Sequence, residues 1–170
     1  EPVGRNTAPP ALMAAMIAAE TDPDALVLLL PSDHLIKQEK VFLDAVFKAE
    51  EAARNGAIVT FGITPTDPNT GYGYIKVAEG SAPVRPVKAF VEKPDLARAE
   101  AFLKDGGYVW NAGIFLYAAQ TMIDAFKTHQ PALFTNVGAV MKSRHSDLDF
   151  VRLDREAFEK LDDISIDYAI

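Results

Sequence analysis

A short, uninterrupted apolar segment constrains the fold of this chain more than any other feature. Residues 25–30 read Ala-Leu-Val-Leu-Leu-Leu, with the turn-forming sequence Thr-Asp-Pro-Asp before them and Pro-Ser-Asp after them. A run of this length between turn signals is typical of a strand that is buried on both faces of a parallel sheet. Parallel sheets occur mainly in α/β proteins. The chain is therefore expected to have an α/β fold.

The segments on either side of this run support that expectation. Apolar residues recur at helical spacing over residues 41–54, and Asn-Gly then ends the predicted helix. A second β-type run covers residues 57–63, so strand, helix and strand follow one another at the length of a βαβ unit with a right-handed connection. Upstream, residues 11–20 are predicted to form a helix, with Thr7 as its N-cap and two prolines near its start.

The rest of the chain alternates between strand-like and helical patterns. Further strands are predicted at 74–77, 84–91 and 108–117, a short helix capped by Asp95 runs through Leu103, and helices dominate from residue 121 onward. We expect a mixed and mostly parallel sheet flanked by helices. Residues 1–170 are expected to form a single domain.

Composition and charge exclude several classes of function. Hydrophobic residues make up 49% of the chain and charged residues 24%, which is ordinary for globular proteins. The 17 basic residues are scattered and the net charge is −7, which argues against a nucleic-acid partner. No apolar run approaches the roughly 18 residues of a membrane span. Cysteine is absent, so disulfides and thiolate metal sites are excluded. A cytoplasmic protein without membrane contact is expected.

The two ends suggest a piece of a longer chain. The sequence starts at Glu1-Pro2 without an initiator Met, and it stops at Ile170 within an apolar stretch. Domain ends are usually polar and frayed. We therefore expect a domain that is truncated at both ends.

Asp33 is the first candidate for chemistry. Ligands of open α/β sheets bind beyond the carboxyl ends of the strands, and Asp33 lies three residues after the apolar run. Its hard carboxylate oxygens suit Mg²⁺. The alternative is an ordinary turn or helix cap, because Pro-Ser-Asp is common turn chemistry.

Two further segments with candidate residues lie at the ends of predicted strands. Glu92 and Lys93 follow a β run, where adjacent side chains point to opposite faces and are not expected to pair with each other. Glu92 could accept hydrogen bonds from sugar hydroxyls while Lys93 meets a phosphate, or both are solvated charges. Gly73 lies in Gly-Tyr-Gly-Tyr, where glycine allows close approach of a ligand to the backbone, or where a hairpin turn needs it.

The remaining candidates are polar groups in apolar or helix-start surroundings. Asn111 lies inside an apolar stretch and needs a partner, which a ligand hydroxyl or a structural β-bulge could supply. Gly4, Arg5 and Asn6 precede a helix N-terminus, a position that favours anions, or they merely cap the helix. Asp167 is either a helix cap or a second metal ligand.

Taken together, these segments resemble one family. The resemblance rests on six motifs in order, which are EPVGRNTAP at 1–9, PSDH at 31–34, TGYGYI at 70–75, VEKP at 91–94, WNAGIF at 110–115 and SIDYA at 165–169. They are similar to those of the bacterial mannose-1-phosphate guanylyltransferases, also called GDP-mannose pyrophosphorylases. The resemblance extends over the whole chain.

The resemblance implies a Rossmann-like nucleotidyltransferase that makes GDP-mannose and pyrophosphate from GTP and mannose 1-phosphate, in the service of polysaccharide biosynthesis. By analogy, Asp33 and Asp167 hold a catalytic Mg²⁺, and Lys93 neutralises the sugar phosphate. Glu92 and Asn111 bind mannose hydroxyls, and Gly73 lets the backbone approach the sugar. The guanine and ribose lie against three consecutive residues, Gly4, Arg5 and Asn6.

The resemblance also sets limits and leaves alternatives open. Nothing before Glu1 supplies the glycine-rich segment with Arg and Lys that wraps the triphosphate in this family, so these 170 residues alone are expected to be inactive. The alternatives are a pyrophosphorylase for another sugar or base, and a non-catalytic sugar-nucleotide-binding module. A parent protein with a phosphomannose isomerase domain, and a homodimer of the full-length protein, also stay open.

Overall fold

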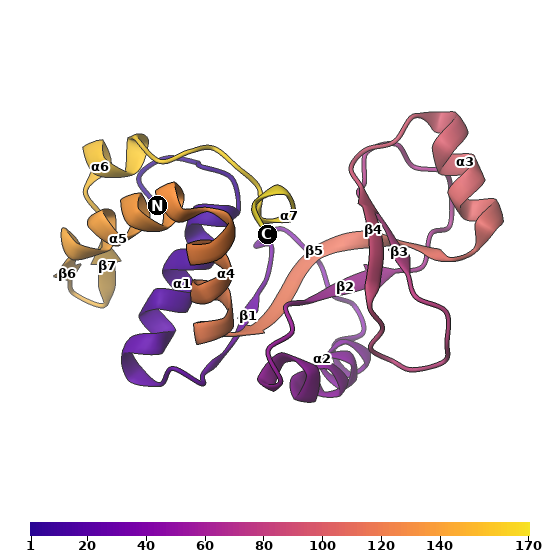
Figure 1. Ribbon diagram of the computed structural model, residues 1–170, viewed down its shortest axis with the longest axis horizontal. Coiled ribbons are helices and arrows are strands. Elements are labelled where there is room, and N and C mark those ends of the chain that lie inside the picture. Colours follow the sequence, from indigo (N-terminus) through magenta and orange to yellow (C-terminus); the bar gives the residue numbers. More distant parts are fainter. The chain divides into compact units, whose positions relative to one another are not determined.

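The computed structural model describes all residues from Glu1 to Ile170, and the chain divides into two compact units. Unit 1 comprises residues 1–27 and 117–170, and unit 2 comprises residues 28–116. The chain passes from one unit to the other within β1 (Leu26–Leu29) and within β5 (Tyr108–Ala118) (Figure 1).

Unit 1 is built on three helices that pack against one another, α1 (Ala8–Thr21), α4 (Ala119–His129) and α5 (Pro131–Lys142) (Figure 1). Their contacts bury large side chains completely, among them Leu12, Met122, Phe126, Leu133 and Val137. Helix α1 starts three residues before the predicted start, because prolines are tolerated in the first turn of a helix. Thr7 is its N-cap residue as predicted, but the hydroxyl does not cap the helix.

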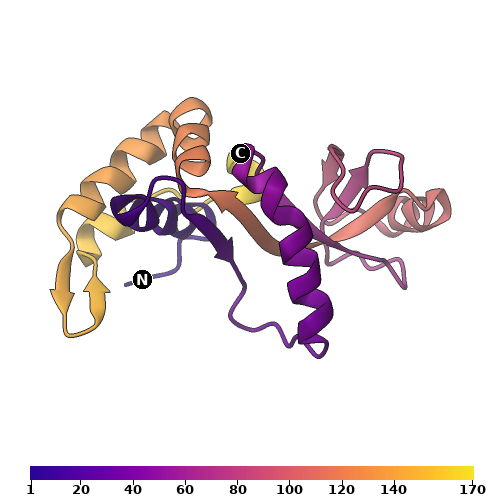
Figure 2. The same ribbon diagram turned by 90° about the horizontal axis from the view of Figure 1, so that it is seen from below.

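The rest of unit 1 is a small hairpin and two short helices. Strands β6 (His145–Asp147) and β7 (Phe150–Arg152) form an antiparallel arm beyond the C-terminal end of α5 (Figure 2). The sequence predicted a mostly helical region from residue 121 onward, and this hairpin was not expected. Strands of three residues are too short to show a clear alternation of apolar and polar side chains. Helices α6 (Arg155–Glu159) and α7 (Ile166–Ala169) follow.

Unit 2 contains most of the sheet. Its elements are α2 (Glu39–Arg54), β2 (Val59–Ile63), β3 (Tyr74–Val77), β4 (Val87–Val91) and α3 (Leu96–Asp105). The strand order is β1-β5-β3-β4, and β2 pairs with β5 as well. The α/β class is confirmed, and the predicted strand–helix–strand order is present. However, β1 and β2 each neighbour β5 and do not neighbour each other.

The direction of the strands differs from the prediction. The pairs β2–β5, β3–β5 and β3–β4 are all antiparallel, so these strands do not form the mostly parallel sheet that was expected. The reason is the connection between them. No helix separates β3 from β4, and a short loop returns the chain in the opposite direction, as in a hairpin.

Burial along β1 and α2 is also lower than predicted. The four residues of β1 are half-buried instead of fully buried. In α2, Ala49 and Ala53 carry the buried face, whereas Val41 is exposed. None of the helices in the chain combines the length and the apolar character needed to cross a membrane.

Helix α3 follows its local sequence signals closely. The Asp95 carboxylate accepts a hydrogen bond from the Arg98 backbone N–H at 2.9 Å, which is the predicted N-cap. Gly106 ends the helix in the left-handed region with φ 74°. The helix packs Ala99 against Tyr74 and Trp110. This cluster anchors the first residue of β3 and the third residue of β5, next to the candidate site.

Candidate functional site

Four of the predicted site residues lie together in unit 2, just before β3, just after β4 and within β5. We call Gly73, Glu92, Lys93 and Asn111 the strand-end cluster. The register explains their proximity, because Tyr74 of β3 is paired with Val91 of β4 on one side and with Trp110 of β5 on the other. The neighbours of these paired residues are cluster residues, because Gly73 directly precedes β3, Glu92 directly follows β4 and Asn111 is the next residue of β5. The Asn111 backbone N–H donates to the Gly73 carbonyl at 2.8 Å.

Gly73 makes room for protein atoms. A Cβ placed on Gly73 would lie 2.7 Å from Glu92 Oε2 and 2.8 Å from Phe90 Cζ, both well inside van der Waals contact. The residue is buried. The prediction was a close approach of the backbone to a ligand. The structure places the Glu92 carboxylate against this backbone, so glycine here holds Glu92 in position.

Glu92 and Lys93 form an ion pair, which corrects the prediction that they cannot meet. Lys93 Nζ lies 3.3 Å from Glu92 Oε1. The alternation of side chains applies only within a strand, and β4 already ends at Val91. Lys93 has a left-handed backbone with φ 42°, a conformation that costs a residue other than glycine about 1–2 kcal/mol. Its side chain is 64% exposed and that of Glu92 is 27% exposed, so the ammonium group is accessible.

Asn111 lies next to an irregularity in β5. Thr60 of β2 is paired with Phe115 and Gly62 is paired with Asn111, so β5 uses more residues than β2 over the same stretch. Gly113, with φ 66°, supplies the left-handed backbone of this bulge. Asn111 Oδ1 accepts a hydrogen bond from Thr60 Oγ1 at 2.9 Å and one from the Gly113 N–H at 3.3 Å.

Thr60 was missed by the sequence analysis. The one available signal was a lone hydroxyl within the apolar run at 57–63. Its partner is 51 residues away in the sequence, and only strand pairing brings the two together.

Asp33 is exposed and lies in the turn that follows β1, as predicted. Its carboxylate is therefore accessible at the end of a strand. No group of three or more His, Cys, Asp or Glu side chains in the chain could hold a metal ion by itself.

Asp167 lies in unit 1, in the first turn of α7, and is half-buried. Three contacts fix this short helix. Thr7 Oγ1 accepts from the Ile166 N–H at 2.9 Å, the Ala8 N–H donates to the Ile164 carbonyl at 3.1 Å, and Gln130 Nε2 donates to the Ala169 carbonyl at 3.3 Å. We call these contacts the α7 clamp. They place Asp167 although the helix has only four residues.

The segment before α1 is occupied largely with its own unit. Arg5 Nη2 donates to the Glu159 carbonyl at the end of α6, and Arg5 Nε is buried without a hydrogen-bond partner. Asn6 has a left-handed backbone with φ 58°, and its Oδ1 accepts from the Thr7 N–H at 3.0 Å. Gly4 is exposed, and a Cβ there would meet nothing within 4 Å. The Arg5 side chain thus has a structural partner that the sequence did not suggest.

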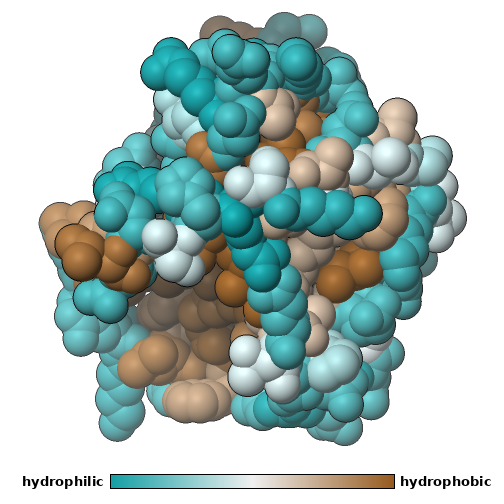
Figure 3. All heavy atoms as spheres, turned by 90° about the vertical axis from the view of Figure 1, so that its left-hand side faces the viewer, coloured by the Kyte–Doolittle hydropathy of each residue, from teal (hydrophilic) through white to brown (hydrophobic).

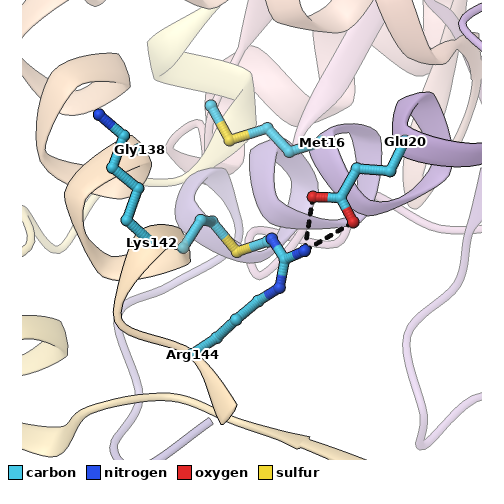
Figure 4. Close-up of a pocket in the computed structure, with 6 residues that line it drawn as sticks. Met16, Glu20, Gly138, Lys142 and Arg144 are labelled. Atoms are coloured by element: carbon cyan, nitrogen blue, oxygen red, sulfur yellow. Dashed lines mark hydrogen bonds and ion pairs between the residues drawn. The ribbon is translucent and has the colours of Figure 1, made fainter. Parts of the chain in front are cut away.

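Unit 1 also has an open pocket of about 540 Å³ between α1 and α5. Figure 3 shows the side of this unit that carries α5 and the hairpin, with hydrophobic side chains gathered in a hollow between hydrophilic ones. The pocket is lined by Met16, Glu20, Gly138, Met141, Lys142 and Arg144 (Figure 4). Arg144 forms an ion pair with Glu20 at 2.6 Å, so its charge is already compensated (Figure 4).

A larger cavity in unit 2, of about 810 Å³, lies between α2, β2 and residues 83–87. Its walls are mainly apolar, and Asp44, Lys48 and Arg85 are its charged residues. None of the predicted site residues lines either of these two pockets. The candidate functional groups are therefore the strand-end cluster, Asp33 and the α7 segment.

Comparison with known proteins identifies the family of the chain. The family described as "Nucleotidyl transferase" matches residues 1–156, and the chain belongs to this family. It is 46% identical over 170 residues to the xanthan biosynthesis protein XanB of Xanthomonas campestris pv. campestris. It is 43% identical over 173 residues to a mannose-1-phosphate guanylyltransferase of Salmonella muenchen. The resemblance drawn from the motifs is confirmed.

Two solved structures share the fold. One, described as mannose-6-phosphate isomerase from Helicobacter pylori, has a TM-score of 0.88 and 34% identity over 99% of this chain and 64% of its own. The other, described as mannose-1-phosphate geranyltransferase from Thermus thermophilus, has a TM-score of 0.84 and 33% identity over 100% of this chain and 48% of its own. The whole of this chain aligns with XanB and with the Salmonella relative. It covers only 36% of the length of XanB and 37% of the length of the Salmonella protein.

Proposed function

We propose that this chain is part of an enzyme that transfers GMP from GTP to mannose 1-phosphate, giving GDP-mannose and pyrophosphate. The observation that carries the proposal is the strand-end cluster. It combines a carboxylate, an amide and an accessible ammonium group, which are the groups that a sugar phosphate needs. The names of the guanylyltransferase relatives support the choice of mannose and GTP.

In unit 2, each group of the cluster has a distinct role. The Glu92 carboxylate accepts hydrogen bonds from mannose hydroxyls, and Asn111 binds a further hydroxyl. Lys93 leaves its ion pair with Glu92 and neutralises the sugar phosphate, because a phosphate offers more negative charge than one carboxylate. Its left-handed backbone is the kind of local strain that accumulates at functional sites.

The chemistry needs no general base. An anionic oxygen of mannose 1-phosphate attacks the α-phosphorus of GTP, and the bond from that phosphorus to the bridging oxygen of the β-phosphate breaks. Pyrophosphate leaves with the electron pair. The protein contributes positioning and neutralisation of charge.

In unit 1, Gly4, Arg5 and Asn6 are proposed to lie against the guanine and ribose. The open space around Gly4 supports this role. Arg5 contributes through the backbone, since its guanidinium group is held by the Glu159 carbonyl.

Asp33 and Asp167 are proposed as ligands of Mg²⁺. Magnesium usually takes one or two carboxylates together with waters and substrate phosphates, so a cluster of three protein ligands is not required. Asp33 is accessible in its turn, and the clamp fixes the backbone of α7 that carries Asp167. When bound, the ion supplies Lewis-acid polarisation of the α-phosphate and orients the reactants.

A chimera tests the proposal. These 170 residues replace the matching segment of XanB, and GDP-mannose formation is measured for the chimera and for the 170-residue chain alone. We expect turnover by the chimera and little or none by the chain alone. Asp33→Asn and Asp167→Asn should each abolish turnover in the chimera, whereas Asp67→Asn, in an exposed loop, should not.

Three results would count against the proposal. A folded chimera that binds mannose 1-phosphate without turnover favours a non-catalytic module. A chimera that uses another sugar 1-phosphate or another nucleotide in preference favours a different pyrophosphorylase. Full activity of either Asp variant removes that residue from the metal site.

A further inference from the structure

The loop before β3 leads directly into the strand-end cluster. We call residues 69–73, Asn-Thr-Gly-Tyr-Gly, the glycine loop. Its last residue is Gly73, against which the Glu92 carboxylate is seated. Glycine loses more conformational freedom on ordering than any other residue, so a loop with two glycines would sample many conformations if nothing restrained it. Specific contacts are therefore needed to hold its shape.

One of these contacts comes from the core of unit 2. Tyr74 is completely buried, and its ring packs against Ala99, Phe102 and Trp110. Its hydroxyl donates a hydrogen bond to the Asn69 carbonyl at 2.9 Å. The first residue of the glycine loop is thus tied to the first residue of β3. Phenylalanine would pack in the same way, so the core alone does not require the hydroxyl.

Two further contacts hold the middle of the loop. Asn69 Oδ1 accepts a hydrogen bond from the Gly71 N–H at 2.8 Å, which is a typical side-chain turn of Asn. The Tyr72 ring lies edge-on against Trp110, with 5.1 Å between the ring centroids. Gly71 and Tyr72 are exposed, whereas Tyr74 is buried. Water therefore competes least with the hydrogen bond of the Tyr74 hydroxyl.

We propose that Tyr74 is a positioning residue, whose hydroxyl holds the glycine loop in the shape that the sugar site needs before the sugar phosphate binds. This role rests on the proposed function of the strand-end cluster. It deepens that function, because it names a group outside the cluster that keeps Gly73 in place against Glu92. A loop that is already ordered avoids an entropic cost on binding. Loss of the hydroxyl should therefore weaken sugar binding and leave the chemical step unchanged.

The test compares Tyr74→Phe with Tyr117→Phe. Each change removes one hydroxyl from a completely buried ring. Tyr117 is the matched control, because its hydroxyl donates to the Ala11 carbonyl at 3.2 Å within unit 1. Order in the glycine loop is measured in the 170-residue protein by acrylamide quenching of Trp110, which is the single tryptophan of the chain and contacts Tyr72. The values of kcat and KM are measured in the chimera with XanB.

We expect Tyr74→Phe to raise the quenching constant of Trp110 and to raise KM for mannose 1-phosphate roughly three- to tenfold, the range for one lost hydrogen bond. An unchanged kcat and an unchanged KM for GTP should accompany this effect, because only binding of the sugar phosphate is weakened. Tyr117→Phe should leave the quenching constant and both KM values unchanged. A Tyr74→Phe protein that does not fold is replaced by Asn69→Ala, which removes the acceptor of the Gly71 N–H, with the same expected outcome.

Each other outcome overturns a defined part. Unchanged quenching in folded Tyr74→Phe shows that the loop is held without the hydroxyl, and the positioning role fails. Raised quenching with an unchanged KM overturns the link between the loop and the sugar. An equal rise of KM in Tyr117→Phe assigns the effect to lost stability. If the wild-type chimera forms no GDP-mannose, the proposed function fails, and the quenching still decides whether Tyr74 holds the loop.

Discussion

The two units hold their candidate residues by different physical means. In unit 2, the register of β3, β4 and β5 places Gly73, Glu92 and Asn111 side by side, so the sheet itself builds the cluster. In unit 1, Asp167 lies on a helix of four residues that is not part of a sheet and packs against α1. There, the three hydrogen bonds of the α7 clamp fix the position of the helix, as strand pairing fixes the cluster residues in unit 2.

This difference shows where each region is vulnerable. A strand ladder distributes the positioning over many backbone hydrogen bonds, so no single side chain is decisive. Steric fit is the weak point, because packed strands leave no room for additional atoms. A clamp made of a few contacts is open to the loss of one hydroxyl. Unit 2 should therefore respond most to added volume, and unit 1 to lost hydrogen bonds.

The largest expected effect is that of Gly73→Ala in unit 2. The new methyl group would lie 2.7 Å from Glu92 Oε2 and must displace Glu92, Phe90 or the start of β3. We expect a loss of about 2–3 kcal/mol in the free energy of unfolding, the upper range for overpacking. Binding of mannose 1-phosphate should weaken by about tenfold, because the displaced Glu92 carboxylate is a proposed sugar ligand and a loss of about 1.4 kcal/mol in binding free energy corresponds to tenfold in Kd. Denaturant unfolding and an NMR titration measure the two effects.

Gly138→Ala in unit 1 is the control for Gly73→Ala. A Cβ at this position in α5 would meet nothing within 4 Å, and alanine is the better helix former by about 1 kcal/mol. This variant should be as stable as the wild type or more stable. Equal destabilisation of the two variants would show that the strand-end cluster is not limited by volume, and the contrast between the units would be lost.

A smaller effect is expected for Thr7→Val in unit 1. The change leaves the Ile166 N–H without its acceptor and should cost about 1–2 kcal/mol. Hydrogen exchange at Ile166 should become faster, while exchange in β3 and β5 of unit 2 should not change. Thr128→Val is the control, because the Thr128 hydroxyl bonds a carbonyl of its own helix at 2.9 Å. Unchanged exchange at Ile166 would mean that the other two contacts suffice to hold α7.

The sequence predicted well those features that depend on neighbouring residues. The cap at Asp95 and the left-handed Gly106 define α3, and both signals lie directly at the helix ends. The candidate residues of the strand-end cluster were also found, because Gly, Asn and a charged pair are unusual at the ends of apolar runs. Their proximity was not predictable, since it depends on antiparallel register.

The errors have physical causes of the same kind. The Glu92–Lys93 ion pair was excluded because strand alternation was assumed to continue beyond Val91, where the strand ends. Thr60 was missed because its partner is distant in the sequence and a bulge directs the two side chains toward each other. A mostly parallel sheet was predicted from the apolar run at 25–30, the strand–helix–strand order after it and the family resemblance, although hairpin loops decide the direction of the strands that follow.

The smallest effects concern surface ion pairs. Their contribution to stability should be lost at low pH in unit 1 and at high pH in unit 2. In unit 1, hydrogen bonds from Lys127 and, less strongly, Gln120 lower the pKa of Asp124, and partial burial opposes them. A lowered pKa in the folded state adds stability above the pKa of the unfolded state, and this stability is lost as the pH falls through the folded value. An exposed helical pair contributes about 0.3–0.5 kcal/mol. Asp124→Asn should therefore be less stable than the wild type at pH 7, and the difference should close below a pH of about 4.

In unit 2, the hydrogen bond and the charge of Asp105 raise the pKa of Lys76. The sign is reversed here, because a raised pKa adds stability at neutral pH that is lost as the pH rises through the folded value. The difference between wild type and Lys76→Met should thus be constant through neutrality and close only above a pH of about 10. If both pairs lost their effect on the same side of neutrality, the charges would be responding to the net charge of the whole chain and not to their partners within each unit.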